Sequence, residues 1–500
     1  MTRLSRRNLL KGGLAAAGAG AAVMLNPAWT TAQTMQQTKT IGTETYDAVI
    51  VGAGVAGLAC AIEVHDQGGK PIVLEKMGRP SGNAIFALGS VCVTGTRVQK
   101  QQGIDDDTVD KFYEDMMKVS IQRADPELTR YYAENSAEAA HWLMDVIGVK
   151  FLKIIKAPYP RFGRIHRIDG EGLTGGSLLI RKLLAEAKKR NITVLYHAKA
   201  VELLKNDKME VTGVRALTPD GLKEFNAKGG VLIASGGFSA NREMVTMYMG
   251  GWAANLATRG SPYVTGENIT LTKPLFAQLV HMDQFHGGPI VAETHVNPAD
   301  ILNAGYGIIV SMQGKRIIDE AGTYVAKAKT LPRVTKENRA FQICDANSKN
   351  PQLEKMIKKY TYLNSPFYQA NTIEELAKAA GLPPEETVKT VEGYNEALKN
   401  NALRQLTPPN TLKSPYSVDQ APFYAFPFEG GMTATFGGPK INVRAEVVNT
   451  ERQPIPGLYA AGNAAGGLFY DDYIGGCQIG GATIYGRVAA KEIVKRSKKA

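Results

Sequence analysis

Short runs of apolar residues that end at a glycine recur along the chain and predict the strands of one sheet. Tyr46–Val51 is such a run, and its apolar character fits a parallel strand that is buried on both faces. Leu58–Gln67 then has helical periodicity, and Pro71–Leu74 predicts the next strand. Further runs at 231–233 and 457–461 predict two more strands. Strands that alternate with helices in this way indicate an α/β fold.

The turn between the first predicted strand and helix has a spacing typical of dinucleotide-binding sites. Gly52, Gly54 and Gly57 form a Gly-Xaa-Gly-Xaa-Xaa-Gly pattern. The first glycine permits a tight turn, the second lets the backbone approach a pyrophosphate, and the third lets the helix pack closely on the strand. The helix N-terminus then faces the phosphate charge. Glu75 ends the second strand, where an acid accepts hydrogen bonds from ribose hydroxyls.

Small, glycine-rich segments follow several of these strands. They stand at 80–84, 87–90, 234–237 and 461–463. Such segments let the backbone lie against a ligand, although a structural loop has a similar composition. If the chain returns repeatedly to one sheet around one long ligand, these distant segments favour FAD. The sequence has no second Gly-Xaa-Gly-Xaa-Xaa-Gly module for a nicotinamide cofactor.

From Tyr46 to the C-terminus, these motifs resemble the soluble flavoproteins related to fumarate reductase and 3-ketosteroid dehydrogenase. The resemblance implies an α/β, glutathione-reductase-like Rossmann domain that binds FAD, with an inserted α+β capping domain. It implies noncovalent FAD, because the segment 81–90 lacks the histidine that holds flavin in membrane-bound succinate dehydrogenases. The motifs that carry it are VGAGVAGLACA with Glu75, Ser81-Gly82-Asn83, Ala234-Ser235-Gly236-Gly237-Phe238, Thr265-Gly266-Glu267, IPGLYAAGNAAGG and Gly486-Arg487.

The motifs and the resemblance together predict a set of residues around FAD. Most are glycines or small residues that follow strands, and the others are polar residues near them. The predicted cofactor-binding residues are Gly52, Gly54, Ala56, Gly57, Glu75, Lys76, Ser81, Gly82, Asn83, Gly89, Ala200, Val201, Ser235, Gly236, Gly237, Gly266, Glu267, Gly462, Asn463, Gly476, Gln478 and Ile479.

The predicted domain order places the capping domain inside the FAD-binding domain. We expect a signal peptide at 1–32 and a polar linker at 33–43. The FAD-binding domain is expected at 44–280 and again at 433–500, with the capping domain at 281–432. Within the cap, the pattern predicts strands near 307–310 and 341–343 and a helical stretch at 373–398, with Pro383-Pro384 at a helix start.

The resemblance also implies three catalytic residues. In the family, the proton donor comes four residues after a segment like Gly314–Glu320; fumarate reductases have arginine there, whereas this chain has Tyr324. Tyr473 stands where carboxylate-binding members have another arginine, and 3-ketosteroid dehydrogenases have tyrosine at both positions. His286 matches a substrate-binding histidine of fumarate reductases. Each of the three remains open to a second interpretation as a packing or turn residue.

These departures favour a particular substrate class. Arginine recognises a carboxylate with a charged, bidentate fork, so two tyrosines in place of two arginines remove two formal charges. The segment 430–435 also lacks the family's carboxylate-binding histidine. We therefore expect a neutral enone or an aromatic enoate in place of fumarate or succinate. Tyr306 and Phe469 are expected to enlarge the apolar surface.

Three residues of another segment, Arg164, His166 and Arg167, are expected near the cofactor or under the cap, or else in a solvated basic loop. The sequence does not distinguish these positions.

The N-terminus predicts export. Ser5–Lys11 contains paired arginines, a weakly apolar stretch runs from Gly12 to Leu25, and a small-residue cleavage site ends at Ala32. The apolar run is too short for a membrane span. The segment resembles the twin-arginine signal, which exports proteins folded around a cofactor. We therefore expect a periplasmic protein, with an ordinary secretory signal as the alternative.

Net charge and cysteine spacing limit which cofactors and partners are expected. The net charge is +12, and +8 without the signal, which favours a solvated surface, with an acidic redox partner or an anionic substrate as alternatives. The four cysteines have no CxxC spacing, which excludes c-type haem, zinc ribbons and a disulfide framework. No basic run with interleaved aromatics indicates nucleic acid. We expect no metal, no integral membrane span, and an external electron-transfer partner such as a periplasmic cytochrome.

The sequence therefore predicts a periplasmic FAD-dependent oxidoreductase that acts on a CH–CH or C=C bond conjugated to a carbonyl. The expected activity is that of an enone or enoate reductase; the alternative is a 3-ketosteroid-type dehydrogenase, which uses the same site in the oxidative direction. A hypothesis of another class is a flavin-bearing electron-transfer subunit without a substrate of its own.

Overall fold

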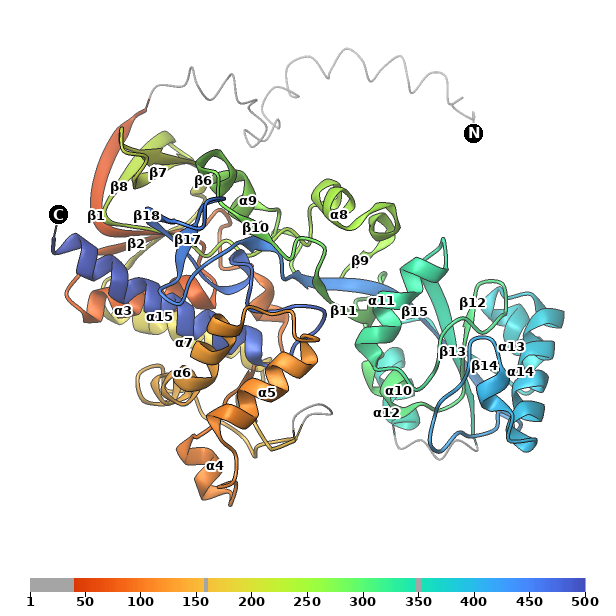
Figure 1. Ribbon diagram of the computed structural model, residues 1–500. Coiled ribbons are helices and arrows are strands. Elements are labelled where there is room, and N and C mark those ends of the chain that lie inside the picture. The colour runs from red at the N-terminus through yellow and green to blue at the C-terminus, as the bar shows by residue number, and fades with distance from the viewer. Residues whose placement is uncertain (1–39, 157–160, 347–351, 500) are drawn as a thin grey trace, which may run out of the picture.

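The computed structural model describes residues 40–156, 161–346 and 352–499, which form two lobes (Figure 1). The predicted signal peptide at 1–32 lies outside the described residues, as do the first residues of the predicted linker. The end of the linker was predicted wrongly: strand β1 begins at Gly42, because Gly42 and Thr43 already pair with Lys223 and Glu224.

The first lobe is built on an eight-stranded sheet around β1 (Gly42–Val51). β1 pairs in parallel with β2 (Pro71–Leu74) on one side and with β8 (Gly221–Ile233) on the other. The order is β17-β18-β8-β1-β2-β5, and β7 and β6 extend from β8 in antiparallel pairs. The other strands are β5 (Thr193–Leu195), β6 (Lys199–Lys205), β7 (Val211–Thr218), β17 (Glu446–Val448) and β18 (Pro454–Ala460). The strands predicted by the apolar runs are confirmed.

Three helices pack together against this sheet. The sequence predicts the first of them, and it begins three residues earlier than expected, at Val55. In Figure 1, α3, α7 and α15 lie below the sheet: α15 packs on β8 and β1, α3 packs on β1 and β2, and α7 packs on α3. The helices of this lobe are α3 (Val55–Asp66), α4 (Arg97–Gln101), α5 (Val109–Val119), α6 (Pro126–Asp145), α7 (Gly175–Lys189), α8 (Arg242–Met249), α9 (Glu267–Thr272) and α15 (Cys477–Ser497).

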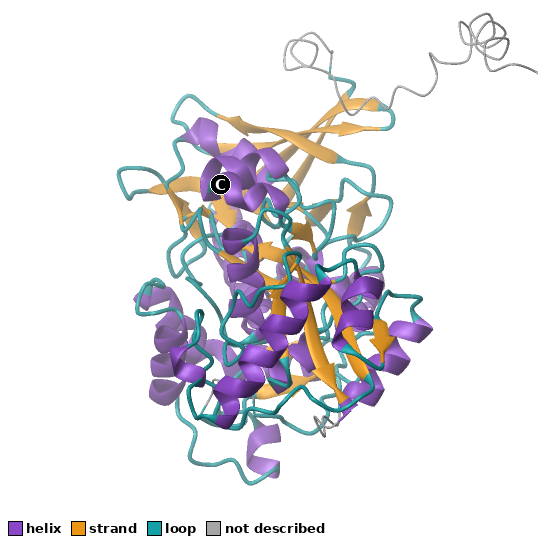
Figure 2. Ribbon diagram, turned by 90° about the vertical axis from the view of Figure 1, so that its right-hand side faces the viewer, coloured by secondary structure: helices purple, strands orange, loops and turns teal. Residues whose placement is uncertain are grey.

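The second lobe contains a six-stranded sheet with helices on both faces, which Figure 2 shows. Alternate side chains of one strand point to opposite faces, so Ile308 packs toward α13 and α14 while Ile309 packs toward α11 and α12. The strands are β9 (Ala257–Thr258), β11 (Phe285–Ile290), β12 (Ile308–Ser311), β13 (Arg339–Asp345), β14 (Tyr368–Ala370) and β15 (Phe423–Thr435). The helices are α10 (Ala299–Ala304), α11 (Tyr324–Val334), α12 (Leu353–Tyr362), α13 (Ile373–Ala380) and α14 (Pro384–Lys399).

The predictions for this lobe are largely confirmed. β12 and β13 match the strands expected near 307–310 and 341–343. The expected helical stretch at 373–398 is two helices, because Gly381 ends α13 with φ +70° and Pro384 begins α14.

Strand β15 reaches from the second lobe toward the first (Figure 1). Its first half pairs with β13, its second half pairs with β11, and β9 pairs with it at Gly431 and Met432. β9 belongs to the predicted FAD-binding domain, and β15 runs past the predicted boundary at 432. The division into domains at 280 and 432 stays a prediction. Two small sheets complete the fold: β3 (Ser90–Cys92) with β4 (Ile165–Arg167), and β10 (Leu279–Val280) with β16 (Gly438–Pro439).

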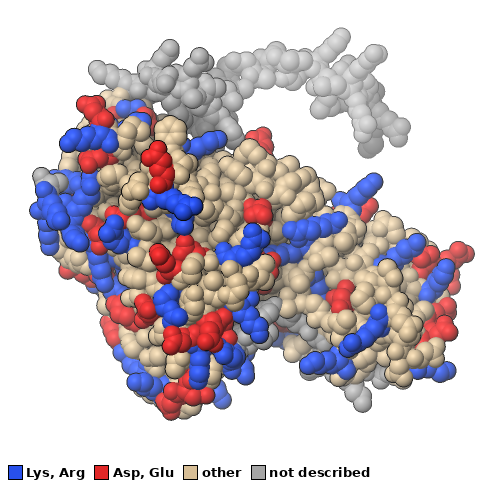
Figure 3. Space-filling view, viewed as in Figure 1, with Lys and Arg blue, Asp and Glu red and all other residues tan. Residues whose placement is uncertain are grey.

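The surface and the core show how charge and cysteine are distributed. On the face in Figure 3, basic and acidic side chains are intermixed. All four cysteines are buried and unpaired. Within the described ranges, no helix is long and apolar enough to cross a membrane. The same ranges contain no group of three or more His, Cys, Asp or Glu side chains that would hold a metal ion.

Arg164 is fully buried in an ion-pair network that the sequence did not indicate. Its guanidinium donates hydrogen bonds to Asp107 at 2.6 and 2.7 Å and to Asp115 at 2.6 Å. His166, two residues on, is hydrogen-bonded to Thr96 at 2.8 Å. Both residues therefore stabilise the core, and neither lies in a solvated basic loop.

We expect Arg164→Met to lower the free energy of unfolding by about 3 kcal/mol, because the Asp107 carboxylate then stays buried without its counter-ion. Denaturant unfolding of the mature protein measures this. The matched control is Arg181→Met: Arg181 is 63% exposed and lies 3.9 Å from Glu171, so its loss should cost less than about 0.5 kcal/mol. Equal midpoints for the two variants would contradict the role of Arg164.

Candidate active site

One cavity of about 560 Å³ is lined by residues of both lobes. Its wall in the first lobe comes from the β1–α3 turn, the ends of β2 and β8, the segment 80–88 and the start of α15. Its wall in the second lobe includes side chains of β11, α11 and β15. The cavity therefore lies along the carboxyl ends of the parallel strands, where ligands bind in open α/β sheets.

The β1–α3 turn has the geometry that the glycine spacing predicts. Gly52 has φ +109°, and a Cβ there would lie 2.6 Å from the Ala234 oxygen. A Cβ at Gly57 would collide with the Gly52 carbonyl oxygen, so this glycine allows helix and strand to pack closely. Gly54 has open space, because a Cβ there meets only the Ala234 oxygen at 3.9 Å. No side chain caps α3, which leaves its first N–H groups for a ligand.

Two acidic residues line the cavity beside this turn. Glu75 accepts hydrogen bonds from the Ala53 N–H at 3.0 Å and the Met77 N–H at 2.9 Å. Burial raises the pKa of Glu75, and these two donors oppose that shift. Lys76 donates to the Glu267 carboxylate at 2.6 Å, which joins the end of β2 to the start of α9 and lowers the pKa of Glu267 against the effect of its burial.

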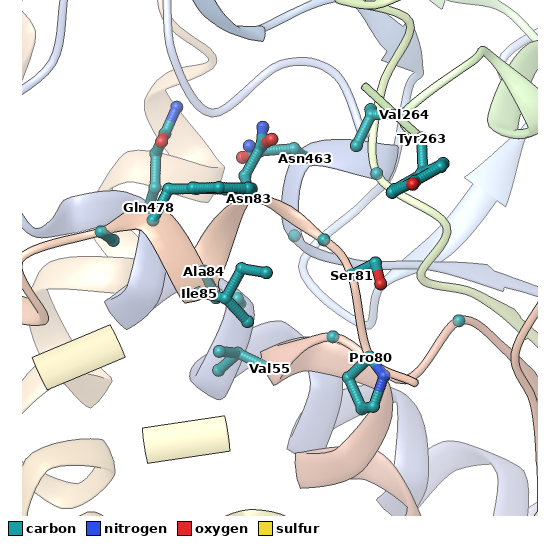
Figure 4. Close-up of a pocket in the computed structure, with 18 of the residues that line it drawn as sticks. Val55, Pro80, Ser81, Asn83, Ala84, Ile85, Tyr263, Val264, Asn463 and Gln478 are labelled. Carbon is teal, nitrogen blue, oxygen red and sulfur yellow. The ribbon is translucent and has the colours of Figure 1, made fainter. Parts of the chain in front are cut away.

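Polar side chains gather farther along the cavity. Figure 4 shows Asn83, Asn463 and Gln478 close together, with Val55, Ala84 and Ile85 below them as drawn. Asn83 is held on both sides of its amide: it donates to the Thr433 oxygen at 2.8 Å and accepts from the Ser261 N–H at 2.7 Å. This amide ties a cofactor-site segment to β15.

The cavity wall fits an extended cofactor that carries phosphates, hydroxyls and carbonyls. Glu267 Oε2 and Gln478 Nε2 are buried on cavity-lining residues and have no hydrogen-bond partner among the described residues. Buried polar atoms without partners are costly, so a ligand that supplies the missing partners stabilises them. The starts of α3 and α15 also place two helix N-termini at the cavity, where negative charge is favoured.

Most of the predicted cofactor residues line the cavity, and a few lie behind its wall. A Cβ at Gly89, Gly237, Gly266 or Gly476 would crowd neighbouring atoms, so these glycines permit close packing. Gly57, Gly89, Val201, Gly237, Gly266 and Gly476 do not line the cavity. Gly52, Gly54, Ala56, Glu75, Lys76, Ser81, Gly82, Asn83, Ala200, Ser235, Gly236, Glu267, Gly462, Asn463, Gln478 and Ile479 do.

The three residues predicted to be catalytic come from distant segments and line the same cavity. His286 lies on β11, Tyr324 begins α11, and Tyr473 stands four residues before α15. The His286 and Tyr473 rings pack edge to face with centroids 4.7 Å apart. His286 Nδ1 lies 3.5 Å from Asp472, an ion-pair distance without a formed hydrogen bond. Burial lowers the pKa of His286, and Asp472 opposes this.

Both tyrosines are held in their protonated form. Burial raises the pKa of Tyr324, and Asp472 adds to this shift while Arg259 opposes it. Burial also raises the pKa of Tyr473, with smaller contributions from Tyr324 and Asp472. At neutral pH both hydroxyls are therefore hydrogen-bond donors.

The sequence did not indicate Arg259, which also lines this end of the cavity. It directly follows β9, its N–H donates to the Met432 oxygen at 2.9 Å, and its guanidinium donates to Thr433 Oγ1 at 2.7 Å. The inference that two tyrosines in place of arginines leave the site uncharged is therefore incomplete. Arg259 belongs to no motif, and only the pairing of β9 with β15 places it here.

Two residues expected to enlarge the apolar wall do not line the cavity. Tyr306 packs on Tyr416, with ring centroids 4.8 Å apart, and Phe469 packs behind Tyr473 at 5.5 Å. Ile290 on β11 lines this part instead.

Comparison with known proteins identifies the family. Residues 47–480 match the family model described as FAD binding domain. The chain is 32% identical to the NADH:fumarate oxidoreductase of Klebsiella pneumoniae over 91% of its own length and 48% of that protein's, so it spans about half of this relative. It is 30% identical to a fumarate reductase (cytochrome) of Shewanella frigidimarina, over 91% of this chain and 78% of the relative. The acrylate reductase flavoprotein subunit of Shewanella woodyi is 28% identical over 98% of both chains.

Solved structures agree with these relatives. An open conformation of a flavocytochrome c3 fumarate reductase matches with a TM-score of 0.81 and 26% identity, over 99% of this chain and 82% of that one. A 3-ketosteroid-delta4-(5alpha)-dehydrogenase from Rhodococcus jostii matches with a TM-score of 0.71 and 26% identity, over 93% and 99%. The Rossmann-like FAD fold, the FAD cofactor and the oxidoreductase class are thereby shown.

We expect Gly54→Ala to weaken FAD binding by about tenfold or more while the protein without cofactor stays folded. The added methyl group has room in the protein itself but stands where the backbone must approach the pyrophosphate. Titration of the deflavinated variant with FAD measures the Kd, and its thermal midpoint reports folding. The control is Gly251→Ala, which also has open space but lies outside the cavity. An unchanged Kd for Gly54→Ala would place the pyrophosphate elsewhere.

Proposed function

The chain belongs to the FAD binding domain family, and from this membership we propose that it is a periplasmic reductase of a C=C bond conjugated to a carbonyl. The observation that carries the proposal is the single cavity, which joins the glycine turn of the cofactor site to His286, Tyr324 and Tyr473. Proton donors and a cofactor site in one cavity suit reduction of a polarised double bond.

Three side chains of the protein have separate roles in the proposed reaction. Bound FAD would supply hydride chemistry at one carbon of the double bond. Tyr324 donates a proton to the neighbouring carbon, which its raised pKa allows at neutral pH. The Tyr473 hydroxyl hydrogen-bonds the substrate carbonyl oxygen, where negative charge develops. His286 packs against the Tyr473 ring and fixes its orientation.

The relatives support the reductive direction. Several carry reductase names, for fumarate and acrylate among others. The export signal expected at 1–32 supports a periplasmic location, and the proposal includes an external electron-transfer partner such as a periplasmic cytochrome. A different class, an electron-transfer subunit without a substrate, is disfavoured because three ionisable side chains and an arginine surround the substrate end of the cavity.

A second candidate runs the same site in the oxidative direction, as a 3-ketosteroid-type dehydrogenase. The match to the Rhodococcus jostii dehydrogenase favours it, together with the two tyrosines that the resemblance assigns to that enzyme class.

Anaerobic reoxidation of the chemically reduced protein tests the proposal. We expect aryl enoates or cyclic enones to restore the absorbance of oxidised flavin much faster than fumarate does. Rapid reoxidation by fumarate would contradict the substrate class, and no reoxidation by any alkene would contradict the reductase. Dehydrogenation of a saturated ketone by the oxidised protein, with an artificial electron acceptor, would favour the second candidate.

We expect Tyr324→Phe to lower kcat by about 100-fold or more, because it removes the proton donor. Tyr473→Phe should lower kcat by about 10- to 100-fold through loss of one hydrogen bond to the carbonyl. Because both pKa values are raised, both hydroxyls stay protonated as the pH rises, so the wild-type rate should not fall between pH 7 and pH 9. Steady-state assays measure these values, with Tyr362→Phe as an exposed control. A rate for Tyr324→Phe within twofold of wild type would remove it from the mechanism.

A further inference from the structure

We propose that Arg259 binds a carboxylate of the substrate, so that the protein is an enoate reductase and does not act on neutral enones. The inference rests on the proposed function and narrows its substrate class. It is carried by the position, the packing and the missing counter-ion of this one side chain.

The structure holds Arg259 in a fixed place at the substrate end of the cavity. β9 pairs with β15, and the Arg259 N–H donates to the Met432 oxygen at 2.9 Å. The guanidinium donates to Thr433 Oγ1 at 2.7 Å. It lines the cavity together with Tyr324 and Tyr473, and all three belong to different segments.

Glycines on two strands make room for this side chain. A Cβ at Gly288 on β11 would lie 2.7 Å from the Arg259 Cζ, and a Cβ at Gly431 on β15 would lie 3.1 Å from its Cβ. A larger residue at Gly288 would displace the guanidinium. The space for the arginine is therefore built into the sheet beside the cavity.

The charge of Arg259 is not neutralised by the protein. Burial lowers its pKa, and the groups that oppose this are Tyr324 and Tyr473, which are uncharged at neutral pH. Among the described residues, the buried arginines Arg164, Arg316 and Arg487 each form an ion pair within 4 Å, whereas Arg259 forms none. Arg259 is only partly buried, but a cation withdrawn from water without a counter-ion is still costly, and an anion in the cavity reduces that cost.

A carboxylate on the substrate matches this site better than a ketone. The guanidinium has five N–H donors in a planar fork, and one of its nitrogens is engaged by Thr433. An enoate places its carboxylate directly next to the double bond, so an arginine that binds it also stabilises negative charge at the oxygen during reduction. The Arg259 guanidinium can bind one carboxylate, and Ile290 with the tyrosine rings forms an apolar wall for the rest of the substrate.

Equilibrium binding of two saturated probes to the oxidised holoenzyme tests the proposal. 3-Phenylpropionate is the product of an aryl enoate, and 4-phenylbutan-2-one is the product of the matching enone. Changes in the flavin absorbance report the Kd of each. We expect the wild type to bind the acid at least about tenfold more tightly than the ketone, since hydrogen bonds to a charged group are the stronger ones.

Substitution of Arg259 should remove this preference. Arg259→Met should weaken acid binding by roughly 10- to 100-fold and change ketone binding by less than about threefold. Arg259→Lys keeps the charge without the fork and should lie between the two. Arg242→Met is the control, because Arg242 is exposed on α8 outside the cavity. FAD content and thermal midpoint check each variant, and the wild-type comparison stands even if Arg259→Met does not fold.

Several results would overturn the proposal. Equal weakening of acid and ketone in Arg259→Met would make the residue structural. An unchanged Kd together with a lower reduction potential would assign the guanidinium to the reduced flavin. A wild type that binds neither 3-phenylpropionate nor butanoate would also exclude the carboxylate site. If alkenes reoxidise the reduced protein but the acid and the ketone bind equally well, the proposed reductase function holds and the carboxylate site at Arg259 is wrong. If acid binding depends on Arg259 but no alkene reoxidises the protein, the carboxylate site holds and the reductase function is wrong.

Discussion

The backbone pairing of β15 is the constraint on which the site depends. This strand is hydrogen-bonded to β13 at one end, to β11 at the other, and to β9 beside them. It brings His286 on β11 and Arg259 after β9 to one place, although they belong to different strands that do not pair with each other. The Asn83 amide then ties this place to the cofactor segment. Main-chain hydrogen bonds thus position side chains more rigidly than a loop would.

The electrostatics of the site follow from the burial of its ionisable side chains. Water is the medium that normally stabilises charge, and its exclusion raises the pKa of both tyrosines and lowers the pKa of His286 and of Arg259. The two tyrosines and His286 are therefore neutral at neutral pH, and Arg259 remains a cation. The same burial that keeps the hydroxyls protonated also strengthens their interactions with charge that develops on a bound molecule.

The fold and the cofactor site could be predicted from the sequence because they depend on local signals. A glycine turn between an apolar strand and a helix identifies itself within a few residues, as Gly52 and Gly57 do. His286, Tyr324 and Tyr473 were found through their places in family segments. Arg259 was not found, because its role arises from a two-residue strand that pairs with β15. The buried ion pairs of Arg164 were not predicted either, since its partners Asp107 and Asp115 are far from it in the sequence.

The shortness of β9 has a consequence for how such proteins diverge. Gly52 and Gly57 of the glycine turn tolerate almost no change, because a Cβ at either position would collide with neighbouring backbone. The residue after β9, by contrast, follows a strand of only two residues, and its side chain is hydrogen-bonded to β15 at Thr433 Oγ1. A lineage can exchange that one side chain without rebuilding the flavin site. Substrate selectivity can therefore change by substitution at this one position while the FAD site stays the same.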